Sequence, residues 1–218
     1  MVGVTSFPDM TQVTLERPAL VRRGLFLNYL TIAYNVVEAV VSIVAGLVAG
    51  SVALLGFGID SAIEVTASGA AQWRLRVDHH EGRRAHAERR TRRIIGVCFL
   101  VLALYIGVDA ASALWQRDAP DRSLLGLVIL AVSLIVMPWL ARQKRTVARA
   151  LASPALQAEA RQTSLCAYLS AIALIGVGLN AALGWWWADP VAALAMTPII
   201  LKEGLDGLRS QNECDDCA

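Results

Sequence analysis

Six long apolar runs follow one another along this 218-residue chain and leave few folds open to it. An α-helix rises about 1.5 Å per residue, so roughly 20 residues cross a hydrocarbon layer about 30 Å thick. The runs cover residues 24–49, 52–71, 94–115, 124–140, 158–183 and 191–208. We therefore predict an all-α integral membrane protein with six transmembrane helices.

Composition agrees with a membrane location. Hydrophobic residues make up 56% of the chain and charged residues only 17%, which is too apolar for an ordinary soluble domain. The segment before the first run contains Pro8, Asp9, Glu16 and Pro18 and has no apolar core. We therefore expect no cleavable signal peptide, and the first apolar run should remain as a helix.

Basic residues are unevenly divided between the two ends of the predicted helices. Seventeen Lys and Arg residues fall on the side of both chain ends, and two fall on the other. The seventeen lie before the first helix, in 74–93, in 142–149 and in or after the end of the last helix; the two are Arg117 and Arg122. Because Lys and Arg are retained in cytoplasmic loops, we expect both termini to be cytoplasmic. The chain then divides into a cytoplasmic tail (1–23), a six-helix membrane domain (24–208) and a short cytoplasmic tail (209–218).

Charged and polar residues inside the predicted spans are candidates for function, because a charge in lipid is costly. Asp60 and Glu64 are four residues apart, which puts both carboxyl groups on one helix face. Glu159, Gln162 and Cys166 form a second stripe on the fifth predicted helix. Both stripes reach the middle of the bilayer, so we expect them to face each other there.

These side chains suit a metal ion. Two carboxylates, a thiolate and an amide oxygen make a plausible four-coordinate site from Asp60, Glu64, Cys166 and Gln162. A thiolate ligand favours zinc, cadmium or a softer ion over magnesium or calcium. Gln162 is a poor ligand and has a second role open to it, as a hydrogen-bond donor to the ligands. Glu159 is its nearest substitute.

At these residues the sequence resembles the cation diffusion facilitator family of metal/proton antiporters. The segments 50–55 and 59–64 look like that family's first loop and second helix, in which acidic residues four apart bind the transported ion. The segment 158–170 is similar to the part of the fifth helix that supplies a His or Asp and then an Asp. Gln162 and Cys166 occupy those positions here. Asp189 and Pro190, before the sixth helix, match as well.

The resemblance implies a transporter, not an enzyme, that exports zinc, cadmium or a similar ion from the cytoplasm in exchange for protons. It implies a homodimer in the cell membrane, for a bacterium the inner membrane. The basic connection has no aromatic pattern typical of nucleic-acid binding, and no predicted span contains a histidine for haem, so we expect no nucleic-acid partner and no resident cofactor. Family members commonly carry a ferredoxin-like cytosolic domain after the sixth helix, and we expect this chain to be a short form without it. Any dimer would then be held through its membrane helices.

Other interpretations remain open. A membrane metal sensor, or a partner subunit that binds the ion without moving it, would use the same ligands. The alternative for Asp60 and Glu64 is an interhelical hydrogen-bonding pair with protonated carboxyl groups, and the alternative for Cys166 is packing as a small apolar residue; for both, we favour the functional interpretation. Glu38 with Asn35, and Asp109, are candidates for an ion path or for structural contacts. We assign Cys98 to packing and leave open the roles of His79, His80 and His86 and of the pair Cys214 and Cys217.

Overall fold

The structure, a computed structural model, describes residues 10–76, 81–151 and 154–209, and within these ranges the chain folds into six helices. The helices are α1 (Met10–Ala49), α2 (Val52–Arg76), α3 (Glu81–Gln116), α4 (Leu124–Ala150), α5 (Pro154–Leu183) and α6 (Ala188–Arg209). Each contains one of the predicted spans, so the predicted all-α fold with six helices is confirmed.

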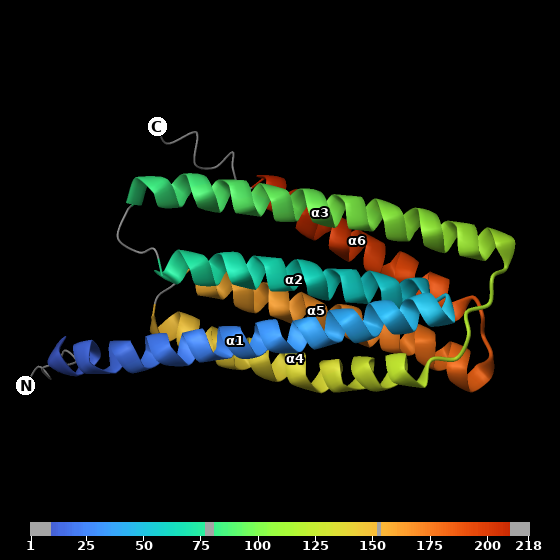
Figure 1. The fold of residues 1–218 in the computed structure, drawn as a ribbon, viewed down its shortest axis with the longest axis horizontal. Coiled ribbons are helices and arrows are strands. Elements are labelled where there is room, and N and C mark those ends of the chain that lie inside the picture. The colour runs from blue at the N-terminus through green and yellow to red at the C-terminus, as the bar shows by residue number, and fades with distance from the viewer. Residues whose placement is uncertain (1–9, 77–80, 152–153, 210–218) are drawn as a thin grey trace, which may run out of the picture.

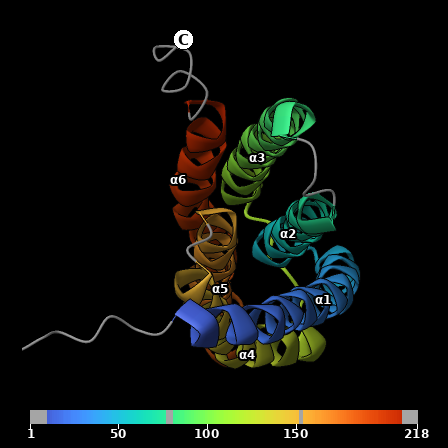
Figure 2. The ribbon, with the colours of Figure 1, turned by 90° about the vertical axis from the view of Figure 1, so that its left-hand side faces the viewer.

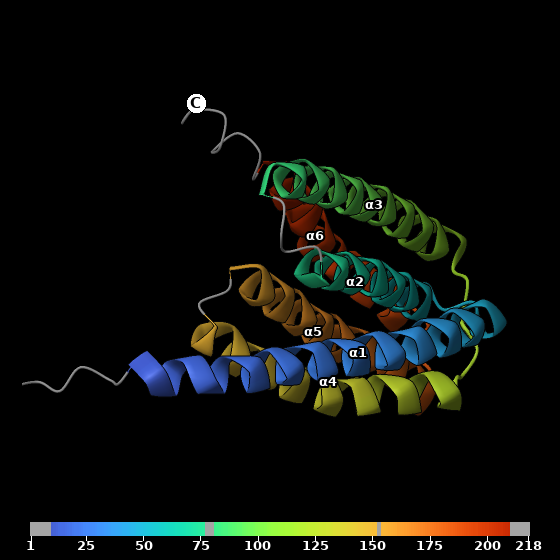
Figure 3. The same ribbon diagram turned by 60° about the vertical axis from the view of Figure 1, so that its left-hand side comes forward.

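The helices form a layered bundle (Figure 1). The view along the bundle shows α3 with α6 on one side, α2 with α5 in the middle, and α1 with α4 on the other side (Figure 2). The most extensive packing joins α4 to α5, α3 to α6 and α1 to α2. Figure 3 shows α3 and α6 together on one side of the bundle, with α2 and α5 between them and α1 and α4. The helices α2 and α5 therefore form the centre of the molecule, and both predicted polar stripes lie on them.

Five of the six helices in the described part of the chain are long and apolar enough to cross a membrane. The helix α6 is not among them, because Lys202, Glu203 and Asp206 interrupt its second half. Its 22 residues are nevertheless long enough for a span. It also packs along α3, which is one of the five.

The strongly basic connections are more helical than we expected. The helix α4 runs ten residues beyond the predicted end at Leu140, and α1 begins well before residue 24. Residues 74–76 and 81–93 continue α2 and α3. Arg, Lys, Gln and Ala are good helix formers in water, so a helix need not end where hydrocarbon ends. Lys144 is consequently part of α4 and not of a loop.

At the end of the bundle away from residues 10 and 209, one carboxyl group on α6 links that helix to the start of α2. Gly50, with φ +66°, makes the tight turn between α1 and α2. Ser51 then caps α2, since its Oγ accepts a hydrogen bond from the backbone N–H of Leu54 at 3.1 Å. The same hydroxyl donates to Asp189 Oδ1 at 2.5 Å. Asp189 Oδ2 accepts from the backbone N–H of Val52 at 3.0 Å. The first turn of α6 thus caps the first turn of α2.

Close approach of α3 and α6 depends on two glycines. A side-chain carbon at Gly96 would lie 3.0 Å from the carbonyl oxygen of Gly204, and one at Gly204 would lie 3.1 Å from that of Gly96. Small residues allow helix backbones in lipid to approach in this way. The backbones of α3 and α6 therefore pack closely against each other at Gly96 and Gly204.

Replacement of Asp189 by alanine should destabilise the protein by about 2 kcal/mol, because it leaves one hydroxyl and the N-terminus of α2 without their charged acceptor. Thermal unfolding in detergent, followed by tryptophan fluorescence, measures this. Asp118→Ala, at an exposed position on the same end, is the matched control and should leave the midpoint unchanged. Equal midpoints for both variants would contradict the assigned cap.

Candidate functional site

Buried polar side chains line the contact between α1, α2, α4 and α5. On α1 and α2 they recur at spacings of three and four residues, which places each set along one helix face. On α4 and α5 they are 11, 4 and 7 residues apart, and these spacings also return to one face. The buried polar residues on these faces are Asn28, Thr31, Asn35, Glu38, Ser42, Asp60, Ser61, Glu64, Ser68, Gln72, Ser133, Lys144, Glu159, Thr163 and Ser170. A column of polar groups therefore runs through the interior of a mainly apolar bundle.

Three carboxyl groups and a thiol meet near the middle of this column. Glu38 of α1, Asp60 and Glu64 of α2, and Cys166 of α5 are all buried, with at most 6% of any of them exposed. The Cys166 Sγ atom lies 3.8 Å from Glu38 Oε2. The thiol also lies beside the carboxyl groups of Asp60 and Glu64. We call these four residues the carboxyl–thiol cluster.

The Glu38 carboxyl group has a hydrogen-bond donor at each oxygen. Ser61 Oγ donates to Oε2 at 2.7 Å, and Ser133 Oγ donates to Oε1. These donors come from α2 and α4, so Glu38 joins three helices. These two hydrogen bonds fix the orientation of the Glu38 carboxyl group beside Cys166.

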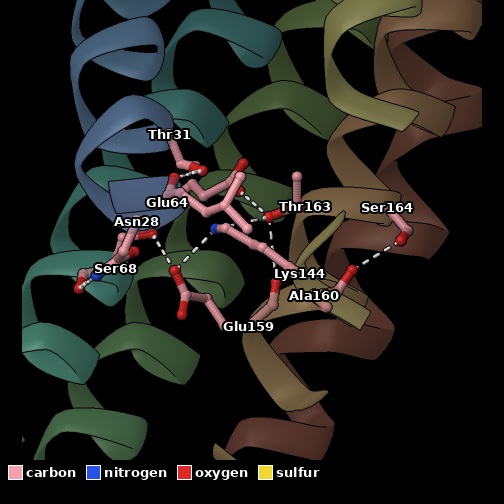
Figure 4. A network of polar contacts seen from close by, with 10 residues as sticks. Asn28, Thr31, Glu64, Ser68, Lys144, Glu159, Ala160, Thr163 and Ser164 are labelled. Atoms are coloured by element: carbon pink, nitrogen blue, oxygen red, sulfur yellow. Dashed lines mark hydrogen bonds and ion pairs between the residues drawn. The ribbon is translucent and has the colours of Figure 1, made fainter. Parts of the chain in front are cut away.

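The Glu64 carboxyl group is only half satisfied. Thr163 of α5 donates its hydroxyl to Glu64 Oε1 at 2.8 Å (Figure 4). The other oxygen, Oε2, is buried and has no hydrogen-bond partner among the described residues. An unpartnered carboxyl oxygen in the interior is costly, so this atom is the best placed in the cluster to accept a cation.

Next to Glu64 lies a buried ion pair. Lys144 Nζ of α4 is 2.8 Å from Glu159 Oε1 of α5, and the two side chains are only 2% and 5% exposed. Lys144 also donates to Thr163 Oγ1 at 3.3 Å. Glu159 Oε1 accepts from Ser68 Oγ of α2 at 3.1 Å. Figure 4 shows Lys144 reaching across from α4 between Glu64 and Glu159.

The ion pair and the carboxyl–thiol cluster occupy different depths. Glu159 precedes Thr163 by four residues and Cys166 by seven, which is about 6 and 10 Å along a helix. Ser68 lies the same four residues beyond Glu64 on the antiparallel helix α2. The ion pair is therefore nearer to the end of the bundle at which α1 begins and α6 ends (Figure 1).

The structure brings together some of the predicted ligands. Asp60, Glu64 and Cys166 are buried and lie near one another in the interior. Gln162 is half-buried, and its Nε2 atom has no partner in the described part of the chain. Glu159 is paired with Lys144 at the other depth. Over the described residues, no group of three or more His, Cys, Asp or Glu side chains is arranged closely enough to hold a metal ion. The four-ligand site stays a prediction.

Other candidates lie outside this column. Asp109 is half-buried on α3 and interacts with Tyr105 of the same helix. Arg161 and Cys98 are exposed. His79, His80, Cys214 and Cys217 fall outside the described residues, as does the side chain of His86. The three described residues, Asp109, Arg161 and Cys98, do not contribute to the carboxyl–thiol cluster.

Sequence reasoning missed Lys144 and Thr163 and ranked Glu38 second. Lys144 was counted with a basic connection because apolar residues thin out after Leu140. A signal was nevertheless present, since Met137, Leu140, Ala141, Lys144 and Ala148 have helical spacing, and all five are buried. Thr163 carries no charge, and nothing in the sequence distinguishes it from a packing residue.

Comparison with known proteins gives one family. The family model described as the cation efflux transmembrane domain matches residues 29–211. An uncharacterized transporter of Synechocystis is 26% identical over 74% of this chain and 54% of its own length. The uncharacterized transporter YdbO of Bacillus subtilis is 29% identical over 88% of this chain and 68% of its own. The magnetosome protein MamB of Paramagnetospirillum magneticum is 26% identical over 75% and 57%. The matches thus cover between 54% and 68% of the length of these relatives.

Replacement of Ser133 by alanine should cost about 1 kcal/mol of stability, because it leaves one oxygen of a fully buried carboxyl group without a donor. The shift is measured by thermal unfolding in detergent. Thr146→Ala is the control on the same helix, since its hydroxyl is exposed and bonds only to its own helix. An equal midpoint shift in the two variants would show that the Ser133 contact does not stabilise the bundle.

Proposed function

The chain belongs to the cation efflux family, a family of membrane transporters, and from that premise we propose that it carries a divalent transition-metal cation across the bilayer through the carboxyl–thiol cluster. The observation that supports this most is the half-satisfied carboxyl group of Glu64, which is 2% exposed and lies beside Asp60 and Cys166. An ion that inserted there would supply the missing partner of Glu64 Oε2. Small movements of the four helices would complete its coordination.

We propose zinc or cadmium as the cargo. Carboxylate oxygens alone would accept magnesium or manganese, but a thiolate favours softer ions. Cys166 is 1% exposed and is the one cysteine in this interior among the described residues. Its position between three carboxyl groups makes it the side chain that determines ion selectivity.

We propose protons as the counter-ion. Ligation by carboxylate and thiolate requires that these groups lose their protons, so that metal binding releases protons and protonation releases metal. Three acidic side chains and one thiol, all buried, provide several exchangeable protons. A proton gradient across the membrane would then drive the metal in the opposite direction.

The orientation that we propose has the basic end of the bundle in the cytoplasm. The start of α1 and the end of α6 lie at this basic end (Figure 1). Arg142, Arg145 and Arg149 of α4 are exposed at the same end. Metal would enter from that side and leave at the end capped by Asp189, which corresponds to efflux from the cytoplasm. In a bacterium the location would be the inner membrane. A homodimer held through membrane helices is the assembly we propose.

Paired substitution of Asp60→Asn and Glu64→Gln should reduce zinc flux into proteoliposomes by about 10- to 100-fold, because two charged ligands are lost while side-chain size is kept. A zinc-sensitive dye in the lumen, with an imposed pH gradient, reports the flux. Asp109→Asn, a carboxyl group within the membrane but outside the cluster, is the control and should keep the flux. Flux that persists in the paired variant would overturn the proposal. Zinc binding by the unmodified protein without any flux would favour a sensor or partner subunit instead.

Replacement of Cys166 by serine should change selectivity more than rate. Loss of the sulfur ligand should lower the ratio of cadmium flux to manganese flux by roughly tenfold, because oxygen ligands favour the harder ion. Parallel flux measurements with each ion alone give this ratio. Cys98→Ser, at an exposed position on α3, is the matched control. If both cysteine variants kept the ratio of the unmodified protein, Cys166 would be a packing residue.

A further inference from the structure

The buried ion pair between Lys144 and Glu159 has no role in the ligand set proposed above. Burying two charges costs several kcal/mol, and the attraction between them seldom exceeds that cost. Replacement of a buried ion pair by apolar residues of similar volume is often neutral or stabilising. The ion pair is therefore more informative about ion movement than about stability.

The ion pair lies between Glu64 and the end of the bundle that carries the termini. Glu159 and Ser68 are one helix turn closer than Glu64 to the end of the bundle that carries the termini, and Ser68 donates to Glu159 at 3.1 Å. Lys144 reaches between them from α4 and donates to Thr163 at 3.3 Å. Thr163 in turn donates to Glu64. Three helices are thus joined across the approach to Glu64.

Two carboxyl oxygens on this approach have no hydrogen-bond partner. Glu64 Oε2 and Glu159 Oε2 are both buried and unpartnered among the described residues. Among the described residues, the cation that lies between the two carboxyl groups is the ammonium group of Lys144, which interacts electrostatically with Glu64 as well as with Glu159. Lys144 therefore holds the position that a positive ion would take in moving from Glu159 to Glu64.

We propose that the Lys144–Glu159 ion pair is a gate on the terminal-bearing side of Glu64, and that the Lys144 ammonium group occupies the entry position of the transported cation. The inference rests on the proposed function. In the closed state the pair separates the carboxyl–thiol cluster from that end of the bundle. When the pair opens, Glu159 becomes the first carboxylate that a divalent cation meets. A cation that has reached Glu64 repels the ammonium group and so resists its return.

The test measures access to Cys166 and not transport. A background with Cys98→Ala, Cys214→Ser and Cys217→Ser leaves Cys166 as the one thiol. A membrane-impermeant, cationic methanethiosulfonate reagent is added to right-side-out or to inside-out vesicles, and the modified fraction is read by mass spectrometry. Lys144→Met, which breaks the pair and removes the positive charge, should speed modification from the terminal-bearing side by about tenfold. Glu159→Gln also breaks the pair but leaves an ammonium group that repels the cationic reagent, so its increase should be smaller. Modification from the other side should not change.

Two further variants separate a gate from a structural contact. Arg145→Met removes a neighbouring contact between α4 and α5, in which Arg145 donates to Ser164 at 2.7 Å at an exposed position, and should leave the rate unchanged. The exchange Lys144→Glu with Glu159→Lys rebuilds the pair and should restore slow modification. If a single variant does not elute as a folded protein, the exchanged pair still tests the proposal, because faster modification of Cys166 in the exchanged pair would contradict the gate.

The proposal is overturned if both single variants react like the background, if they react faster from both sides alike, or if Arg145→Met has the same effect. These outcomes are independent of zinc flux. A one-sided increase in Cys166 modification together with flux that survives in the Asp60 and Glu64 variant would retain the gate and reject the ligand set.

Discussion

Lipid offers no hydrogen-bond partner to a carboxyl, amide or ammonium group, and this constraint explains how the helices are arranged. The buried polar residues of the column lie on the faces that α1, α2, α4 and α5 turn toward one another. Their outer faces carry exposed apolar side chains such as Val40, Val48 and Ile135. The central position of α2 follows, because Asp60, Glu64 and Ser68 need neighbours that can satisfy them.

The fold could be predicted from the lengths of the apolar runs, since only a helix satisfies its own backbone over that distance in hydrocarbon. The ends of the helices could not. Hydropathy decreases where a chain leaves the bilayer, but the helix continues while its residues favour it, as in the last ten residues of α4. The error placed Lys144 in a loop and so concealed half of the buried ion pair.

The candidate site could be predicted in part. Spacing alone put Asp60 and Glu64 on one face of α2 and pointed to Cys166 on α5. It could not show which other helices face that point, because spacing gives a position on a helix and not its neighbours. Glu38 thus emerged as a member of the cluster only when α1 was seen against α2 and α4. Glu159, interchangeable with Gln162 in the sequence, is distinguished by its contact with Lys144.

The cap that Asp189 provides for α2 also determines how the bundle is able to deform. Sliding of α6 along α2 would break the contacts to Ser51, Val52 and Ala53 together. Hydrogen bonds therefore join α2 and α6 at this end, while no comparable set of hydrogen bonds joins their opposite ends among the described residues. This arrangement permits rotation of α6 relative to α2 about Asp189 and opposes sliding of one helix along the other. Displacements should grow with distance from Asp189 and be largest at the depth of Lys144 and beyond.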